Sequence, residues 1–452
     1  MASVNLNGST ATSGSGIDVT SVVAQILANE SGPEDLLKAQ LTQLGTDQAT
    51  ISVYNVGLQS LLSSVHALSD ISGVLNARTA SSSRTDLVTA TADSTAATSQ
   101  HTLIVKNLAT GSSYATDPLA DATTQFATGS FDLQLGTAAA TTITVDGTNN
   151  TLGGLAASIN SQNLGVSASV VTDANGARLA VVSNGTGLPN DITIGNNTTG
   201  LNFNPTASAV NASILVDGID ISSATNSVTG VLGGVTLNLL NASPGAPITL
   251  KVAPDNPNAQ TAVAAFVTAY NASITSVNAQ FTYNPATGSA GSLSASGDLR
   301  SLQTQLLSAS TYSVAGNNGY TTLASLGINL NNDGTLTVDN AKLTDTLSNH
   351  FTEFQTFFQS PTDQTGFAQK LSADLRNLTD PTQGLLNVAL TQSRTDQKAI
   401  QSSINSFEDR LVTRRTLLTR QYSQVDATLR AFPLLLAQIN GALGSLPTSS
   451  GK

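Results

Sequence analysis

The sequence contains no cysteine and no tryptophan, a single methionine, and only 4% aromatic residues. The lack of cysteine excludes disulfide bonds and thiolate metal sites, and it suits an exported protein that avoids thiols. Charged residues make up only 10% of the chain, so its polarity comes mainly from Ser, Thr, Asn and Gln. With 40% hydrophobic residues the chain is too apolar to be disordered throughout, and this composition is typical of a thin, layered β-protein.

Positive charge is also scarce, because the 452 residues carry a formal net charge of -11. This balance argues against nucleic acid as a partner, since phosphate binding needs clustered Lys and Arg. The only basic cluster consists of Arg410, Arg414, Arg415 and Arg420, within a predicted helix. A solvated helix face explains these arginines better than a partner-binding patch does.

Long hydrophobic runs are missing as well, and no stretch is apolar enough to predict a membrane span. Residues 1–19 have neither a basic start nor an apolar centre, so they do not predict a secretory signal peptide. If the protein leaves the cell, we expect a dedicated exporter to carry it. The length predicts roughly three domains rather than one.

Apolar residues recur at heptad spacing near both ends of the chain, which predicts helices with narrow apolar stripes. The first seam consists of Leu37, Leu41, Leu44, Ile51, Leu58, Leu62 and Val65, with Gln48 and Asn55 at the two intervening positions. The second consists of Ile400, Ile404, Phe407 and Leu411 and, after a one-residue slip, Tyr422, Val425, Leu429, Phe432, Leu436, Ile439 and Leu443. We expect the two seams to pack together. An isolated helical hairpin and packing between molecules both remain open.

A short helix should precede the first seam, with Asp18 as its N-cap and an interruption at Ser31, Gly32 and Pro33. The long helix is then expected to run to about Ser72. From about residue 76 the pattern changes to alternation, which predicts β-structure up to residue 252. The clearest expected strands are 86–91, 101–105, 131–135, 143–145, 166–171 and 178–182, with a helix at 152–160 and a compact mixed module at 126–205.

Helical spacing returns in the last 190 residues or so, around 263–270 and 299–307. A hairpin is expected at 328–330 and 336–338, and the stripe ending in Phe351, Phe354 and Phe358 is interpreted as core. The chain therefore runs from helix through β-structure to helix. Its two ends should return to the same place, with the β-modules inserted between them.

No constellation of catalytic or metal-binding residues stands out. His66, His101 and His350 are scattered without ligand spacing, and the Gly-rich runs lack the Lys of a phosphate loop. The stretch 329–340 has some features of a calcium loop, but Asn340 occupies the place of its closing Glu, which favours the hairpin. Carboxylates are plentiful, yet no pair is marked out by spacing. We expect no catalytic, metal or cofactor site.

Several segments together resemble the bacterial flagellar filament cap proteins, also called the hook-associated protein 2 family. They include GIDVTSVVAQILANESGPEDLL, ISGVLNARTASSSRTDLVTATADSTAATSQHTLIVKNLAT, TLGGLAASINSQNLGVSASVVTDANGARLAVVSNGTG, ILVDGIDISSATNSVTGVLGGVTLNLL and LASLGINLNNDGTLTVDNAKL. The resemblance covers about residues 16–445, and its segments follow the order of the family.

The resemblance implies an α+β multidomain fold in which the N- and C-terminal helices pair as a coiled-coil-like leg, with inserted β-rich outer domains. In this division, 1–45 and 405–452 form the leg, 46–78 and 262–404 the inner domain, 79–125 and 206–261 the β-rich outer domain, and 126–205 an inserted mixed β/α module. The seam residues named above would then serve leg assembly.

The resemblance also implies a secreted, non-enzymatic protein at the distal tip of the flagellar filament. It would form a homo-oligomer and help exported flagellin to fold and insert. Implied partners are flagellin, the hook-filament junction protein, an export chaperone and the flagellar type III export apparatus, with host surface glycans as a further option. In the family the chaperone docks near the C-terminus, and the candidate face here consists of Leu435, Leu436, Ile439 and Leu443.

Two positions depart from the family pattern. Ser31 and Gly32 stand before Pro33 where an Arg-Ala-Pro run is common, so no contact of that arginine carries over. Pro433 should kink or break the last helix, which would leave 434–446 as a separate segment. The rivals are a hook-filament junction protein or another axial flagellar protein and, from a different class, a secreted β-rich adhesin. An enzyme ranks third, and the sequence does not give the subunit number.

Overall fold

The computed structural model describes residues 16–286, 288–360 and 365–444. The chain divides into two compact units. The first contains the described parts of 1–69, 263–346 and 352–452, and the second contains 70–262 with 347–351. The ends of the chain thus belong to one unit, and most of the β-structure belongs to the other.

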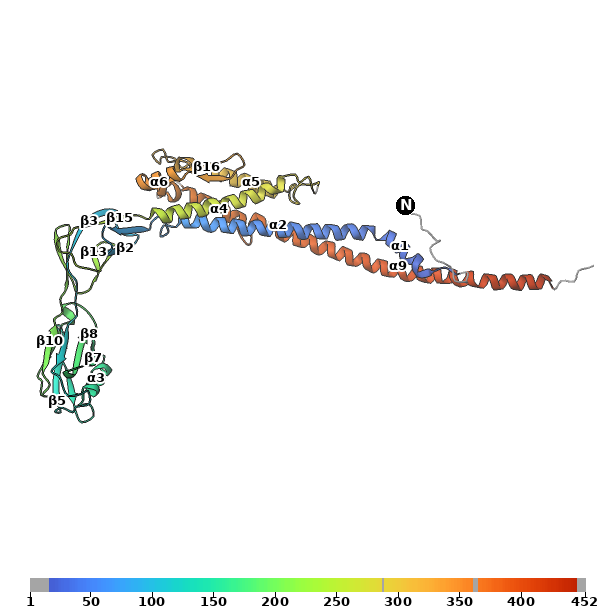
Figure 1. The fold of residues 1–452 in the computed structure, drawn as a ribbon. Helices are drawn as coiled ribbons and strands as arrows, with labels where there is room; N and C mark the ends of the chain where they lie inside the picture. The colour runs from blue at the N-terminus through green and yellow to red at the C-terminus, as the bar shows by residue number, and fades with distance from the viewer. Residues whose placement is uncertain (1–15, 287, 361–364, 445–452) are drawn as a thin grey trace, which may run out of the picture. The chain divides into compact units, whose positions relative to one another are not determined.

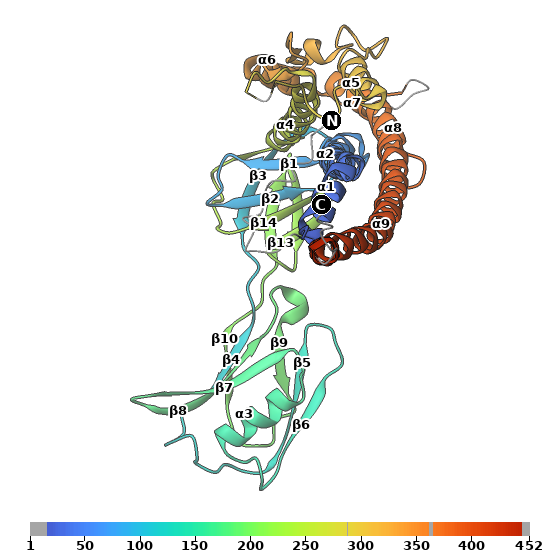
Figure 2. The ribbon, with the colours of Figure 1, turned by 90° about the vertical axis from the view of Figure 1, so that its right-hand side faces the viewer.

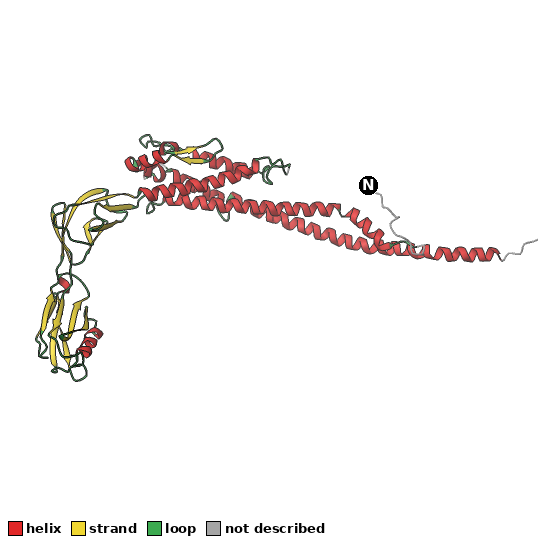
Figure 3. Ribbon diagram, in the orientation of Figure 1, coloured by secondary structure: helices red, strands yellow, loops and turns green. Residues whose placement is uncertain are grey.

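The first unit is mainly helical (Figure 3). Its long helices are α1 (Val19–Glu30), α2 (Gly32–Ser69) and α9 (Leu385–Gly444), and both α1 and α2 lie along α9 (Figure 1). The Asp18 carboxylate caps α1 by accepting the Ser21 N–H at 3.1 Å. The expected interruption between α1 and α2 is confirmed, since Ser31 alone separates them. The expected pairing of the terminal helices is also confirmed.

Shorter elements lie wholly or mainly in this unit. They are α4 (Asn256–Phe281), α5 (Gly297–Ser310), η2 (Leu323–Leu326), β16 (Ile328–Leu330), β17 (Leu336–Val338), α6 (Asn340–Asn349), α7 (Phe351–Gln359) and α8 (Phe367–Thr379). The hairpin of β16 and β17 has the predicted bounds, and Asp333 accepts the Thr335 N–H at 2.9 Å within its turn. Phe354 and Phe358 are fully buried, which confirms that the aromatic stripe is core. Phe367 packs edge-on against Phe266 at 5.7 Å between ring centres.

The second unit contains a module built on a five-stranded antiparallel sheet and a three-stranded one. The first sheet has the order β1-β15-β3-β11-β12, formed by β1 (Arg78–Ser82), β15 (Ile248–Pro254), β3 (Ser99–Asn107), β11 (Ala212–Val216) and β12 (Ile219–Ser223). The second has the order β13-β14-β2, formed by β13 (Ser227–Leu232), β14 (Val235–Leu239) and β2 (Val88–Ala92). Alternating residues such as Leu103, Val105, Leu250 and Val252 supply one shared core.

The second module also consists of two antiparallel sheets, and it contains one α-helix in addition. Its sheets have the orders β10-β4-β8-β7 and β6-β5-β9. The elements are β4 (Ser113–Thr116), β5 (Gly129–Leu135), β6 (Thr141–Val145), α3 (Leu152–Ser161), β7 (Val166–Asp173), β8 (Gly176–Ser183), η1 (Leu188–Asn190), β9 (Ile192–Gly195) and β10 (Phe203–Ala207). Helix α3 packs on β7 and β8 (Figure 2) and closes a core around Phe131, Ile159 and Leu179. The domain boundaries drawn from the sequence stay predictions.

One expectation about the last helix is wrong. Helix α9 continues through Pro433 to Gly444, so 434–444 does not form a separate segment, and residues 445 and 446 lie outside the described part. Proline lacks one N–H donor, which removes a single bond to the carbonyl of Leu429, but its fixed φ is compatible with a helix. The helix therefore continues on both sides of Pro433 although this hydrogen bond is missing.

Candidate assembly surface

The N-terminal half of α2 packs against α9 through a narrow, partly polar seam. Gln48 donates from Nε2 to Ser393 Oγ at 3.2 Å and to Gln397 Oε1 at 3.3 Å. Lys38 on α2 also forms an ion pair with Glu408 on α9 at 3.5 Å. These contacts fix the register of two antiparallel helices, as polar residues do at coiled-coil seams.

This seam is shallow and leaves an open groove between the two helices. Leu37, Leu41 and Leu44 are only half-buried. The groove, of about 530 Å³, is lined by Gln40, Gln43, Leu44, Asp396, Ala399 and Ile400. A two-helix contact of this kind buries one stripe per helix and leaves the flanks accessible.

The C-terminal half of α2 is held much more firmly. Tyr54, Leu58 and Val65 are buried, with exposed fractions of 4%, 2% and 0%. The Tyr54 hydroxyl donates to the Ser276 carbonyl of α4 at 3.3 Å, and burial raises the pKa of Tyr54. The amide oxygen of Asn55 is buried without a hydrogen-bond partner among the described residues. The two halves of α2 thus have different partners and different depths of burial.

Helix α1 is attached to α9 by a small apolar cluster. Val23 and Leu27 pack against Leu418, which is 5% exposed, with Val19, Ile26, Leu411 and Tyr422 partly buried around them. Two polar contacts flank the cluster. Arg414 forms an ion pair with Glu30 at 3.4 Å, and the Ile17 N–H donates to Asp426 at 2.8 Å.

Asp426 joins the start of α1 to α9. Its carboxylate accepts both the Ile17 N–H and the Arg430 Nε–H, the latter at 2.8 Å. The Arg430 hydrogen bond is the main reason that the pKa of Asp426 lies below its ordinary value, and the Ile17 N–H adds to this effect. The Asp426 carboxylate, the Ile17 N–H and the Arg430 guanidinium thus meet where α1 begins.

Around and beyond this contact the apolar stripe of α9 continues with side chains that are about half exposed in the described chain. Val425 is 46% exposed, Leu429 41% and Phe432 57%. The later members of the stripe are Leu436, Ile439 and Leu443, and all three are exposed. Figure 1 shows this end of α9 extending past α1. An apolar stripe that continues a buried seam into solvent is typical of an interaction surface.

The structure thus places the predicted seam residues in three groups. Ile51, Leu58, Val65 and Ile404 are buried. The half-buried group consists of Leu37, Leu41, Leu44, Gln48, Asn55, Leu62, Ile400, Phe407, Leu411 and Tyr422. Val425 and Leu429 are exposed, as are the four residues of the predicted chaperone face. Sequence reasoning missed Leu418, which occupies the gap between the two runs of the second seam.

The predicted arginine cluster lies on the solvated side of α9. Arg414 is paired with Glu30, and the Arg410 guanidinium lies 5.0 Å from the centre of the Phe407 ring. All four arginines of the cluster are exposed. Their contacts agree with a solvated helix face.

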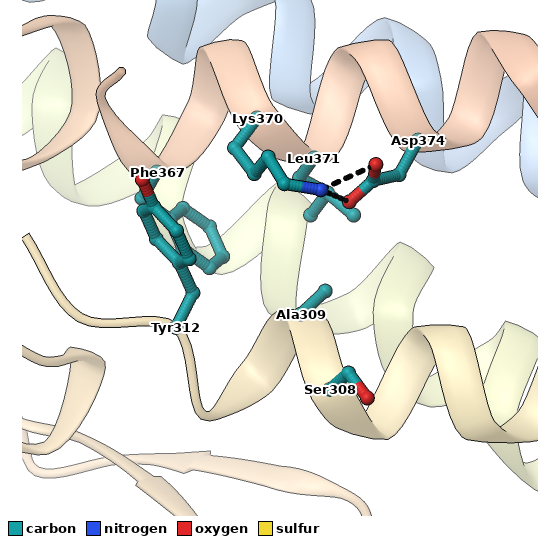
Figure 4. A pocket seen from close by; sticks show the side chains of 7 residues that line it. All are labelled: Ser308, Ala309, Tyr312, Phe367, Lys370, Leu371 and Asp374. Carbon is teal, nitrogen blue, oxygen red and sulfur yellow. Dashed lines mark hydrogen bonds and ion pairs between the residues drawn. The ribbon is translucent and has the colours of Figure 1, made fainter. Parts of the chain in front are cut away.

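A small cavity of about 160 Å³ lies between α5 and α8 (Figure 4). The rings of Tyr312 and Phe367 form one end, and the Lys370 ammonium contacts both carboxylate oxygens of Asp374 at 2.5 Å. This ion pair neutralises the two charges that face the cavity. The Tyr312 hydroxyl is likewise engaged, as it donates to the Thr365 carbonyl at 2.8 Å.

No sequence pattern indicated that His101 belongs to a hydrogen-bonded chain in the first β-module. Its Nδ1 lies 2.6 Å from Asp217 Oδ2, and its Nε2 lies 2.9 Å from Ser99 Oγ. Asp217 occupies a left-handed turn position between β11 and β12, with φ of 49°, and also accepts the Thr102 N–H. The hydrogen bond from His101 is the main cause that lowers the pKa of Asp217. This chain anchors the turn to β3.

Two further kinds of site are absent from the described part of the chain. No group of three or more His, Cys, Asp or Glu residues in the described ranges is arranged to hold a metal ion. Among the described helices, none combines the length and hydrophobicity that a membrane crossing requires.

Paired terminal helices, inserted antiparallel β-modules and an exposed heptad stripe define a protein that works by assembling with other chains. Comparisons with known proteins make the assignment specific. Family models described as the N-terminus and C-terminus of flagellar hook-associated protein 2 match residues 15–112 and 209–432, and the flagellin hook IN motif matches 129–185.

Individual relatives match over nearly the whole chain. The B-type flagellar hook-associated protein 2 of Pseudomonas aeruginosa is 31% identical, with 93% of this chain and 92% of the relative covered. The flagellar hook-associated protein 2 of Escherichia coli K12 is 29% identical, with 92% and 94% covered. The crystal structure of the flagellar cap protein FliD domains D1-D2-D3 from Escherichia coli is 27% identical, covers 76% of this chain and 99% of its own, and has a TM-score of 0.59. The chain therefore belongs to the flagellar hook-associated protein 2 family.

Proposed function

We propose that this protein caps the distal end of the bacterial flagellar filament as a homo-oligomer and promotes the folding and insertion of exported flagellin. The protein is exported and works outside the cell at the filament tip. Its role is structural rather than enzymatic. The observation that carries this proposal is the terminal leg, meaning α1, the start of α2 up to residue 45 and α9 from residue 405 onward, with its exposed stripe. Membership of the family supports the same function.

The energetics of the leg suit a cap that must release and remake contacts as each flagellin enters. The α1–α9 cluster contains only three buried residues, so each local contact contributes modestly. Many modest contacts, distributed over several copies, can hold a cap in place while any one of them opens. The firmly packed C-terminal half of α2 would keep the leg attached during these openings.

Export also fits the composition of the chain. The chain has no thiols to oxidise outside the cell, and the leg has a small core that is easily unfolded. We propose the flagellar type III export apparatus as the route and the hook-filament junction protein as the first neighbour. Binding of host surface glycans by the β-modules is a further proposal, to be tested with isolated residues 79–261.

For the export chaperone we propose the face formed by Leu435, Leu436, Ile439 and Leu443. These side chains have exposed fractions of 54%, 46%, 47% and 59% in the single chain. An amphipathic helix that offers such a face is a common target for a partner with a hydrophobic groove. Deletion of 434–452 should abolish chaperone binding, and unchanged binding would remove this assignment.

The capping function is tested by deleting the gene. The mutant strain should make hooks but few filaments, and unpolymerised flagellin should accumulate in the medium. Re-expression of the full chain should restore filaments, which separates the effect from damage to neighbouring genes. Full-length filaments in the deletion strain would contradict the proposal.

The rival functions have less support. A hook-filament junction protein would not be expected to match hook-associated protein 2 at both ends of the chain. A secreted adhesin would explain the β-modules but leaves the exposed heptad stripe without a role.

A further inference from the structure

Strand β7 forms one edge of the four-stranded sheet in the second module, because among the described strands only β8 pairs with it. Asp173 and Gly176 close the hairpin between the two strands, so the backbone groups of every second residue, counted back from Asp173, bond to β8. The residues between them direct their N–H and C=O groups away from β8. These outward residues include Ala168, Val170 and Thr172.

One of the outward positions already holds an amide. The Asn160 side chain, near the C-terminal end of α3, donates from Nδ2 to the Ala168 carbonyl at 2.8 Å. The Asn160 Oδ1 accepts the Ala168 N–H, also at 2.8 Å. A residue of an antiparallel neighbouring strand would make the same pair of hydrogen bonds. Asn160 thus shows that this edge accepts an amide in the way that it would accept an added strand.

The next outward groups along β7 are not covered in this way. No described residue bonds to the backbone N–H or C=O of Val170 or Thr172. Thr172 is exposed and Val170 is half-buried. Sheet edges are commonly protected by proline, lysine or inward-pointing charges, whereas the only charged residue of β7 is Asp173 at the hairpin turn. The edge is therefore open to a further strand.

Unpaired backbone groups at strand spacing are complementary to the backbone of another extended chain. A folded domain uses most of its own backbone groups in helices and sheets, but an unfolded polypeptide still has them free. Val170 and Thr172 together offer no more than about four hydrogen bonds, each of which contributes modestly in water. Such a site holds a partner weakly and releases it readily.

We propose that the outer edge of β7 binds an extended segment of unfolded polypeptide, which adds to the sheet as a further strand. At the filament tip this polypeptide is exported flagellin that has not yet folded, so the inference rests on the proposed function and deepens it. Folding of the flagellin engages its backbone groups internally and thereby releases the segment. A second copy of this chain is the alternative occupant.

The first test measures whether the backbone of a ligand is recognised. The probe is a fluorescein-labelled peptide of alternating threonine and valine, which favours an extended conformation, and its binding to the full-length protein is followed by fluorescence anisotropy. The same peptide N-methylated at every residue keeps its side chains but donates no backbone hydrogen bond. It should bind at least about fivefold more weakly, the effect of about one hydrogen bond. Equal binding of the two peptides, or binding of neither, would overturn the proposal.

The second test changes the edge itself. Val170 lies opposite Leu179 in a pair that is not hydrogen-bonded, so Val170→Pro removes an outward N–H and keeps the bonds between β7 and β8. This variant should bind the first peptide at least about fivefold more weakly than the wild type. Val170→Thr is the matched control, because it keeps the N–H and the β-branched shape, and it should bind like the wild type.

A third variant acts in the opposite direction. Asn160→Ala frees the N–H and C=O of Ala168 for the ligand and should strengthen peptide binding by about fivefold. Loss of folding cannot produce such a gain. Wild-type affinity in Val170→Pro, or no gain in Asn160→Ala, would contradict the assignment of the site to β7.

Light scattering of the full chain distinguishes an unfolded polypeptide from a second copy. Val170→Pro should leave the mass of the protein unchanged. A smaller mass would show that copies of the chain pair through β7, and the proposed occupant would then be wrong.

Filament growth separates this inference from the capping function. A gene with Val170→Pro should restore filaments to the deletion strain but release more flagellin into the medium than a gene with Val170→Thr. Equal release from the two strains would overturn the role of the β7 edge and leave the capping function intact. Failure of the wild-type gene itself to restore filaments would instead overturn the capping function.

Discussion

Individual polar residues in the α2 seam have opposite energetic roles. Gln48 forms two hydrogen bonds to α9, so its burial is compensated. The buried amide oxygen of Asn55 finds no protein partner in the described chain, and desolvation of such a group costs about 1–3 kcal/mol. Gln48 therefore stabilises the pairing of α2 with α9, whereas Asn55 weakens the packing of the adjoining turn.

This difference gives a prediction for paired variants. Gln48→Leu should lower the free energy of unfolding of the helical unit by about 1 kcal/mol, because two hydrogen bonds are lost. Asn55→Leu should leave it unchanged or raise it by about 1 kcal/mol, because an unpaired polar group leaves the interior. Urea unfolding followed by circular dichroism at 222 nm measures both. A large loss of stability in Asn55→Leu would mean that its amide oxygen has a partner, such as a water molecule.

At the same scale, the sequence predicted some of the buried positions and missed others. Leu58 and Val65 were found because they follow a heptad. Leu61 and Leu68 were missed although both are fully buried, since α2 contacts α9 and α8 and its Tyr54 also bonds to α4. A single heptad stripe predicts one buried face, as in a two-helix contact. A helix inside a larger bundle is buried on several faces, so some of its buried residues lie outside the stripe.

Among the elements, the β-strands were predicted where alternation is long and were missed where it is short. The expected strands at 101–105 and 166–171 lie within β3 and β7. β1, β4 and β9 were not foreseen, since four or five mostly small residues carry little periodicity. The partners of each strand depend on contacts distant in sequence, such as that of β1 with β15, which no local pattern contains.

The attachment of α1 to α9 should depend on pH through Asp426. The pKa of this carboxyl is lowered from its ordinary value of 3.8 in the folded chain, so ionised Asp426 stabilises the contact above that pH. The stabilisation should be lost as the pH falls through the lowered pKa. Hydrogen exchange of 19–30 should be faster in Asp426→Ala than in the wild type at neutral pH, and the difference should vanish in strong acid.

Asp409→Ala serves as the control for this prediction, since it removes an exposed carboxylate, unlike the half-buried Asp426, from the same helix. It should leave exchange in α1 unchanged at every pH. Equal effects of the two substitutions would show that helix charge, rather than the Asp426 contact, holds α1 in place.

Pro433 should make the end of α9 easier to open than its length suggests. Pro433→Ala restores one backbone hydrogen bond and removes a steric clash, which together amount to about 3 kcal/mol in a helix interior. Amide exchange over 430–444 should become markedly slower. Gly441→Ala is the reference substitution, because no other atom lies near the added methyl group. It should stabilise the helix by about 1 kcal/mol. A smaller effect at 433 than at 441 would contradict this account.

The whole molecule contains separate cores in its two compact units. Leu250 belongs to the β-core of the second unit, and Leu58 lies in the helical core of the first. Their composition also differs, since the helical core uses stacked phenylalanines and the β-cores use mainly aliphatic residues. Separate cores of this size predict separate unfolding transitions.

Calorimetry of two variants tests this prediction. Leu250→Ala should destabilise the β-rich unit by about 2–5 kcal/mol and lower one transition only. Leu58→Ala should lower the other transition by a similar amount, and each variant is the control for its counterpart. A single transition that shifts in both variants would mean that the units unfold together.

Helix α2 is one continuous helix whose two halves are packed to different degrees. Its 38 residues span about 57 Å, from the loose α9 seam to the tight packing around Tyr54 and Leu58. The described helix has no break at which displacement of its N-terminal half could be absorbed. Such a displacement therefore exerts a torque on the firmly packed C-terminal half of the helix. An arriving subunit that displaces the N-terminal half of α2 would in this way also load the packing around Tyr54 and Leu58.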